Sequence, residues 1–187
     1  SKLFLITRRE NGQRVRYAHI GTGNFHENTA QTYTDFSLLT SRPEITAEVR
    51  QVFAFCNSPY RSFKFDHLWV SPVTQRAKIC EQIDREIALA ESGKRAKIIL
   101  KLNNLADDEL IARLYEANRS GVQIDACVRG MCSLVPGVPG VSDRIRVISV
   151  VDQFLEHPRV MIFHNDGQPN VFISSADWMT RNIDNRV

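Results

Sequence analysis

The chain has 187 residues and a formal net charge of +3, from 24 Lys plus Arg against 21 Asp plus Glu. Hydrophobic residues make up 43% of it, enough to fill a core, so we expect a globular protein. The charge surplus is too small to predict non-specific nucleic-acid binding, although it allows a local anion site, and no apolar run approaches the roughly 18 residues of a membrane span.

The cysteines are scattered and show neither a Cys-x-x-Cys motif nor the Cys/His spacing of a metal site. They are Cys56, Cys80, Cys127 and Cys132. We interpret them as buried or inert thiols of a protein in the reducing cytosol. The chain opens directly on a strand pattern, "SKLFLI", without a leader, and we expect it to be a fragment of a longer protein.

The sequence of the first part of the chain predicts a hairpin, a strand and a helix, followed by a domain boundary. An Asn-Gly pair between two apolar runs is typical of a β-hairpin, and apolar residues at helical spacing indicate a helix. The boundary is a loop with mixed polarity and a proline, and we divide the chain there into residues 1–66 and 67–187. The elements are a hairpin of strands 3–7 and 15–20, a strand over 33–40, and a helix over 45–56 that carries Val49, Val52, Phe53 and Cys56 on one face.

From residue 68 onward, strands and helices alternate. Such alternation is typical of right-handed crossovers and a mainly parallel sheet, so the fold class is α/β, with helices flanking the sheets. A "PGVPG" segment at 136–140 must be a surface loop. The expected strands are 68–71, 96–102, 122–128 and 145–151, and the expected helices are 73–92 and 108–119.

A second predicted hairpin near the C-terminal end repeats the first. Each copy has a cation, an apolar strand, a Gly-Gln turn, a second strand, and a terminal cluster of small, hydroxyl and amide or acid residues. The cations are Lys2 and Arg159, and the terminal clusters are "GTGN" and "SSAD". An internal repeat predicts two halves that are built alike.

A histidine, His157, stands two residues before the cation of the second copy. The same offset in the first copy falls on the position before Ser1, which the chain does not contain. We therefore expect a histidine to precede Ser1 in the longer protein.

Two His-x-Lys/Arg hairpins of this kind resemble the phospholipase D-like superfamily, in which paired halves bring two histidines to one phosphate. One imidazole would attack phosphorus and the other would protonate the leaving oxygen. Lys2 and Arg159 would neutralise charge on the phosphoryl oxygens. The hydroxyls and amides at the hairpin ends would orient the imidazoles or bind phosphate, and they include Thr22, Asn24, Ser174 and Ser175.

Longer strings are more specific: "YAHIGTGNF", "LKLNNLADDELIARLYEANRSGV", "ISVVDQFLEHPRV" and "ISSADWMTRNIDNRV". Together they resemble the C-terminal half of the type 1 polyphosphate kinase family, and the resemblance covers essentially the whole chain. It implies reversible transfer of the terminal phosphate of ATP to inorganic polyphosphate through a phosphohistidine, with magnesium. It also implies a cytoplasmic homo-oligomer whose partners are polyphosphate and ATP or ADP.

The same resemblance assigns roles to individual residues. Tyr33, Arg129 and His157 would bind the nucleotide, with His157 also the acid/base partner. The hairpin repeat, rather than the resemblance, makes Lys2 a further catalytic residue and Arg159 a phosphate contact. The phosphorylated histidine would precede Ser1, and the magnesium site would lie upstream, so no metal ligand is expected here. The residues expected to support the imidazoles or the phosphate are His19, Asn24 and Ser175.

Two alternatives remain open at this point. A phospholipase D-like phosphodiesterase would use the same histidine pair with water or an alcohol as acceptor, although Arg159 in place of a second lysine counts against it. A non-catalytic polyanion-binding module is the other. The tetrapeptide "GTGN" is a weak phosphate signal, because it has neither the spacing of a P-loop nor the context of a dinucleotide fingerprint. An ATP user without a P-loop must hold the phosphates with cationic side chains.

Overall fold

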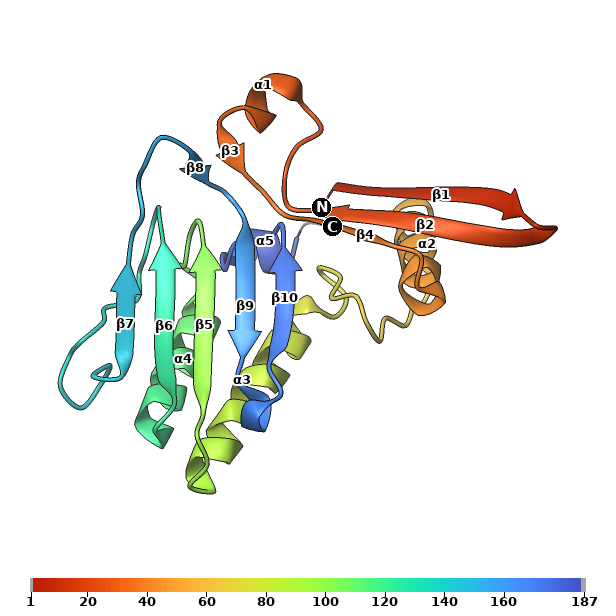
Figure 1. Ribbon diagram of the computed structural model, residues 1–187. Helices are drawn as coiled ribbons and strands as arrows, with labels where there is room; N and C mark the ends of the chain where they lie inside the picture. Colours follow the sequence, from red (N-terminus) through yellow and green to blue (C-terminus); the bar gives the residue numbers. More distant parts are fainter. Residues whose placement is uncertain (1, 186–187) are drawn as a thin grey trace.

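Two groups of strands organise the molecule (Figure 1). The structure is a computed structural model that describes residues 2–185. The N-terminal strands form a small antiparallel sheet with a hairpin that projects away from the rest of the chain (Figure 1). The C-terminal strands form a larger mixed sheet backed by two helices (Figure 1). This confirms the α/β class with mixed sheets flanked by helices. The expected mainly parallel pairing is found only in the centre of the C-terminal sheet, because the N-terminal sheet is antiparallel.

The N-terminal sheet has the strand order β1-β2-β4. Its predicted hairpin is confirmed: β1 (Lys2–Glu10) and β2 (Gln13–Gly21) pair antiparallel around a two-residue turn. Asn11 and Gly12 have φ values of 50° and 80°. Tight hairpin turns of the type I′ class need positive φ at both central positions, which Asn-Gly supplies at low cost. A short helix, α1 (Glu27–Ala30), follows the hairpin.

The prediction of one continuous strand over 33–40 is wrong. The segment forms two strands, β3 (Tyr33–Thr34) and β4 (Ser37–Thr40), and only β4 joins the N-terminal sheet. Thr22 causes the break, because its amide donates to the Phe36 carbonyl and its hydroxyl accepts from the Phe36 amide, both at 3.0 Å. These bonds hold the chain at Phe36 and let β3 turn away toward the C-terminal part of the molecule.

Helix α2 (Pro43–Asn57) packs on one face of the N-terminal sheet. Val49 and Val52 are buried as the helical spacing predicts, but Phe53 and Cys56 are exposed, and Phe55 is buried instead. Phe55 faces the linker that follows the helix, where its ring makes an edge contact with Phe63 at 5.8 Å between centroids. The helical pattern did not predict the burial of Phe55, because Phe55 is covered by the linker and not by a strand of the sheet.

The linker does not form the strand that was expected at 68–71. The amides of Asp66, His67 and Leu68 donate to the buried carboxylate of Glu48 on α2, at 2.7–3.1 Å, instead of to a neighbouring strand. Burial alone would raise the pKa of Glu48, but these backbone bonds and a hydrogen bond with the His67 ring hold it below its ordinary value. The ionised carboxylate of Glu48 therefore holds the linker against α2.

The C-terminal sheet has the strand order β10-β9-β5-β6-β7. Its centre is parallel, β5 with β6 and β6 with β7, whereas β9 pairs antiparallel with both β5 and β10. The antiparallel part is the second predicted hairpin, with a 3-10 turn η1 (Asn165–Gly167) at its tip. The strands are β5 (Lys97–Leu102), β6 (Gln123–Val128), β7 (Ile145–Ile148), β9 (Arg159–Phe163) and β10 (Asn170–Ser174).

Two helices, α3 (Gln75–Glu91) and α4 (Asp108–Ser120), cover one face of this sheet and enclose the main core (Figure 1). The predicted ends of α4 are confirmed. The Asp107 side chain accepts from the Leu110 amide at 3.0 Å, and Gly121 ends the helix with a φ of 102°. The last helix is α5 (Thr180–Ile183). No helix within the described residues is both long and apolar enough to cross a membrane.

Candidate active site between the two units

A short parallel pairing joins the two groups of strands, which we call the N-terminal and the C-terminal unit. β3 pairs with β8 (Leu155–Glu156), which immediately precedes the second hairpin (Figure 1). The Leu155 amide donates to the Thr32 carbonyl at 2.8 Å, and the Thr34 hydroxyl donates to the Leu155 carbonyl at 3.2 Å. The pairing fixes residue 157 beside the segment that follows β3.

His157 is held on three sides at this junction, and its side chain is 14% exposed. Its Nδ1 lies 2.7 Å from Asp35 Oδ1, and its ring centroid lies 5.1 Å from that of Tyr33. Arg159 Nη1 lies 3.1 Å from Nε2 of His157. A guanidinium can only donate, so this geometry assigns a neutral ring that carries its proton on Nδ1 and accepts at Nε2.

Asp35 is the functional candidate that the sequence reasoning missed. The Thr22 hydroxyl donates to the same Oδ1 atom at 2.6 Å. Gly23 packs so closely on the carboxylate that a Cβ there would overlap it. The "GTGN" segment therefore seats a carboxylate, which then meets His157. Asp35 lies within the segment that was predicted as a strand over 33–40, but nothing in one sequence indicates a contact with a histidine 122 residues away.

The cation of the second hairpin forms a buried ion pair. Arg159 donates through Nε and Nη2 to the two carboxylate oxygens of Asp177, at 3.1 and 3.2 Å, and through Nη1 to the His157 carbonyl at 3.1 Å. The Arg159 and Asp177 side chains are 10% and 6% exposed. Burial by itself would raise the pKa of Asp177, but the charge and hydrogen bonds of Arg159, with those of Asn104, hold it below its ordinary value.

Asp177 connects this ion pair to the carboxyl ends of the parallel strands. The amides of Asn103 and Asn104 donate to its Oδ1 at 2.9 and 3.1 Å. Asn103 in turn accepts from Arg129 Nε at 2.8 Å. Within residues 2–185 the two terminal nitrogens of Arg129 have no protein partner, so this guanidinium is oriented by one bond and open to a ligand.

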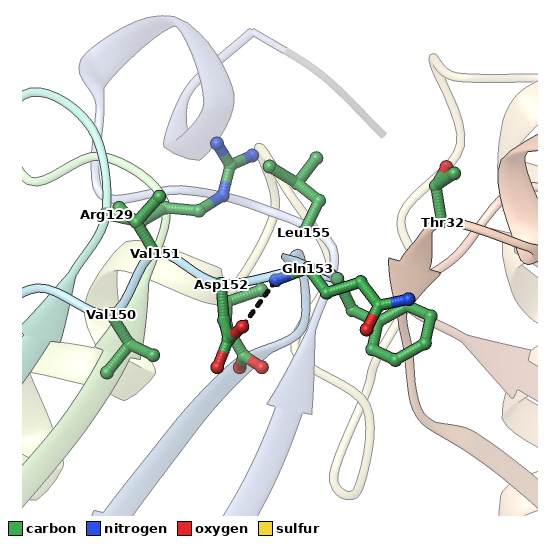
Figure 2. Close-up of a pocket in the computed structure, with 9 residues that line it drawn as sticks. Thr32, Arg129, Val150, Val151, Asp152, Gln153 and Leu155 are labelled. Carbon is green, nitrogen blue, oxygen red and sulfur yellow. Dashed lines mark hydrogen bonds between the residues drawn. The ribbon is translucent and has the colours of Figure 1, made fainter.

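Arg129 also lines a pocket of about 240 Å³ between the two units. Figure 2 shows Arg129 on one side of the pocket and Thr32, the neighbour of Tyr33, on the other. Residues 150–156 form the rest of the wall and end directly before His157. Arg129, which was predicted as a site residue, and the segment that leads into His157 therefore line the same pocket.

Lys2 approaches the same junction from the first hairpin. It is the Cα partner of Gly21, which directly precedes Thr22, the residue that donates to Asp35. Lys2 forms no ion pair in the described part of the chain. Of the predicted supporting residues, Asn24 is exposed and Ser175 is partly buried.

His19 lies elsewhere on the first hairpin. Its ring is 6% exposed, stacks on Phe4 at 4.8 Å, and contacts Phe25 at 5.0 Å. Its Nε2 lies 3.0 Å from the Ser37 hydroxyl. These are packing and local hydrogen-bond contacts within the N-terminal sheet, and none of them reaches His157.

A metal site is not evident in this part of the protein. Residues 2–185 contain no group of three or more His, Cys, Asp or Glu side chains arranged to hold a metal ion. The steps below therefore place no metal ion on residues of this chain.

Comparison with known proteins bears on the identity of this fold. The family model described as "Polyphosphate kinase C-terminal domain 2" matches residues 68–187, and "Polyphosphate kinase C-terminal domain 1" matches residues 1–62. The polyphosphate kinases of Vibrio parahaemolyticus and Escherichia coli are 61% and 59% identical over all 187 residues, which cover 27% of each relative.

A solved structure is also similar. The crystal structure of polyphosphate kinase from Porphyromonas gingivalis matches with a TM-score of 0.89 and 41% identity, over 97% of this chain and 28% of that one. This chain thus spans about a quarter of the length of the proteins that it resembles. On these matches, the chain belongs to the polyphosphate kinase family.

Proposed function

We propose that this chain supplies part of the catalytic machinery of an ATP:polyphosphate phosphotransferase. The convergence of the two units on His157 carries the proposal. Asp35 and Tyr33 come from the N-terminal unit and contact the imidazole of His157, which belongs to the C-terminal unit. Arg129, also from the C-terminal unit, lines the pocket beside them. This combination suits a reaction that moves a phosphoryl group and a proton at one place.

The proposed reaction has two displacements. A nitrogen of the histidine that the family resemblance puts before Ser1 attacks the γ-phosphorus of ATP, the bond from that phosphorus to the bridging oxygen breaks, and ADP leaves. A terminal oxygen of polyphosphate then attacks the phosphohistidine, and the phosphorus–nitrogen bond breaks. The chain grows by one phosphate, and the histidine is regenerated.

The residues of this chain have separate tasks in that scheme. In the first displacement a protonated His157 gives its Nε2 proton to the leaving oxygen of ADP. In the second, the neutral ring takes a proton at Nε2 from the attacking polyphosphate oxygen, and Asp35 holds Nδ1 throughout. Arg129 offers its free terminal nitrogens to phosphate oxygens, and Lys2 adds a further positive charge. Tyr33 contacts the nucleotide beside the His157 ring. Arg159 stays a predicted phosphate contact, but its Nε and Nη2 already donate to Asp177 and its Nη1 to His157, so only the second hydrogen on Nη2 is left for a phosphate oxygen.

The wider predictions belong to the same proposal. Residues 1–66 and 67–187 are parts of two catalytic domains, ATP and polyphosphate are the substrates, and magnesium enters with the nucleotide or through residues outside this chain. The full-length protein is a homo-oligomer in the cytoplasm. The four free cysteines support a reducing compartment.

The test uses the full-length protein that carries this sequence, with γ-labelled ATP. Formation of an acid-labile, base-stable phosphoprotein and labelled polyphosphate is the expected result. His157→Gln should slow transfer by about 10²- to 10⁴-fold, the contribution of general acid–base catalysis. His26→Gln is the matched control, since His26 is exposed and makes only a weak contact, 3.4 Å, with Thr29. Cleavage of a phosphodiester without labelling would instead support the phosphodiesterase alternative.

A further inference from the structure

The segment that carries His157 has little regular structure of its own. Residues 149–158 connect β7 with β9, and among them only Leu155 and Glu156, the two residues of β8, lie in a strand. That strand pairs with β3 of the N-terminal unit, so its ladder does not tie the segment to the C-terminal sheet. The position of His157 relative to that sheet therefore depends in part on side-chain contacts.

Lys101 makes such a contact from β5, the middle strand of the C-terminal sheet. It lies opposite Val160 in the last pair of the β5–β9 ladder. Pro158, two residues before Val160, is buried and has no amide hydrogen with which to continue the ladder. The Nζ of Lys101 donates to the Pro158 carbonyl at 3.3 Å and lies 3.3 Å from Oε2 of Glu156. One ammonium group thus holds the residues on both sides of His157.

The surroundings of this ammonium group strengthen its hold. The side chains of Lys101 and Glu156 are 21% and 29% exposed, so solvent screens the pair less than it would on an open surface. A hydrogen bond from a charged donor is stronger than one between neutral groups. The carbonyl of a buried residue also needs a partner, which a neutral aliphatic side chain could not supply.

A second ion pair on the same strand lacks any link to His157. Lys97 lies four residues before Lys101, on the same face of β5. Its Nζ is 2.6 Å from Oδ2 of Asp125 on β6, and the two side chains are 23% and 17% exposed. The two lysines therefore form pairs of similar burial, but only Lys101 reaches the segment that carries the imidazole.

We propose that Lys101 is a positioning residue for His157, an inference that rests on the proposed function. It fixes the backbone before and after His157, while Asp35 and Arg159 contact the ring itself. Proton transfer needs Nε2 within hydrogen-bond reach of the reacting oxygen. A displacement of about 1 Å can lower the rate by about 100-fold, so the anchor of this segment should influence kcat.

The experiment uses the full-length protein that carries this sequence. Lys101→Met removes both contacts, Lys101→Arg keeps a charged donor, and Lys97→Met is the matched control on the same strand. The measurements are kcat and KM for ATP in polyphosphate synthesis, phosphoprotein formation from γ-labelled ATP, and the midpoint of thermal unfolding.

Lys101→Met should lower kcat by roughly 10- to 100-fold and change KM for ATP by less than about twofold, because Arg129 and Tyr33 keep their places. Lys101→Arg should restore most of the lost kcat. Lys97→Met should shift the unfolding midpoint about as much as Lys101→Met does, since the two ion pairs are similarly buried, but it should keep the kcat of the wild type.

Wild-type kcat in Lys101→Met would overturn the inference. An equal loss of kcat in Lys97→Met would also do so, because it would show a general effect of weakening β5. A rise in KM at constant kcat would contradict it as well, since Lys101 would then act on the ligand. If Lys101→Met does not fold, Lys101→Gln takes its place with the same expectations. If the wild type forms no phosphoprotein, the proposed function itself fails, which is a distinct result.

Discussion

The two hairpins share a register but treat their cations differently. Lys2 is the partner of Gly21 and Arg159 is the partner of Ser174, so each cation stands at the same place, in the terminal residue pair of its described ladder. Arg159 is buried and neutralised by Asp177. In the first hairpin, the residue that corresponds to Asp177 is Asn24, which brings no charge.

Because of this difference, the two cations have different roles, although they occupy equivalent positions in the sequence repeat. A buried guanidinium needs a carboxylate partner, and the resulting pair is a rigid support. Arg159 uses this support to hold the His157 carbonyl and ring. Lys2 forms no ion pair within residues 2–185. In the mechanism that we propose, the second hairpin therefore positions an imidazole, and the first hairpin supplies free positive charge.

Breaking the buried pair should have the largest effect on stability. Arg159→Met leaves the Asp177 carboxylate buried without its cation, and the free energy of unfolding should fall by about 3–5 kcal/mol. Lys2→Met, the same change in the first hairpin, should cost less than about 1 kcal/mol, because no buried partner loses its charge. Urea unfolding at neutral pH measures both.

The double variant Arg159→Met/Asp177→Asn tests the charge itself. It removes both charges but keeps an oxygen that can accept from the Asn103 and Asn104 amides, so it should lose less stability than Arg159→Met alone. Equal losses in Arg159→Met and Lys2→Met would show that the two cations have the same surroundings and would contradict the comparison.

The contact between the units gives the next largest effect. Asp35→Asn keeps an oxygen near His157 Nδ1 but removes the negative charge that favours the Nδ1–H tautomer. We expect kcat of the full-length protein to fall by up to about 10²-fold, with KM for ATP unchanged. Asp166→Asn is a matched control, because Asp166 forms an exposed ion pair with Lys94 at 2.5 Å. A fall in stability without a change in kcat would argue for a purely structural role.

The sequence could predict the second hairpin and its relation to the first, because alternating apolar residues and an Asn-Gly or Asp-Gly turn are local signals. It could also predict the ends of α4 from Asp107 and Gly121. It could not predict Asp35 as a partner of His157, since their contact depends on the pairing of β3 with β8. The same holds for the linker, where the carboxylate of Glu48 replaces the expected strand.

The stability at acid pH should depend on the charge of Asp177, whereas the equivalent residue Asn24 has no charge to lose. The pKa of Asp177 is lowered in the folded state, so its stabilising contribution is complete above its unfolded pKa of about 3.9 and is lost as the pH falls through the folded value. Asp177→Asn should cost about 1–3 kcal/mol at neutral pH. This difference from the wild type should stay constant above about pH 5 and narrow below about pH 4, as urea unfolding across the pH range can measure. A difference that does not change down to pH 2 would contradict the assignment.

The smallest effect on stability should come from making the first hairpin resemble the second. Asn24 is exposed, so Asn24→Asp should change the free energy of unfolding by less than about 0.5 kcal/mol. Its effect on ligand binding should be larger, because the repeat puts the new carboxylate at the position from which Asp177 neutralises Arg159, where it would oppose the charge of Lys2. Weaker polyphosphate binding with unchanged stability is the expected result, and Asn24→Ser, which adds no charge, should leave binding close to that of the wild type. If Asn24→Asp binds polyphosphate as the wild type does, then a neutral residue at this position is not what keeps Lys2 available, and the two hairpins differ only in burial.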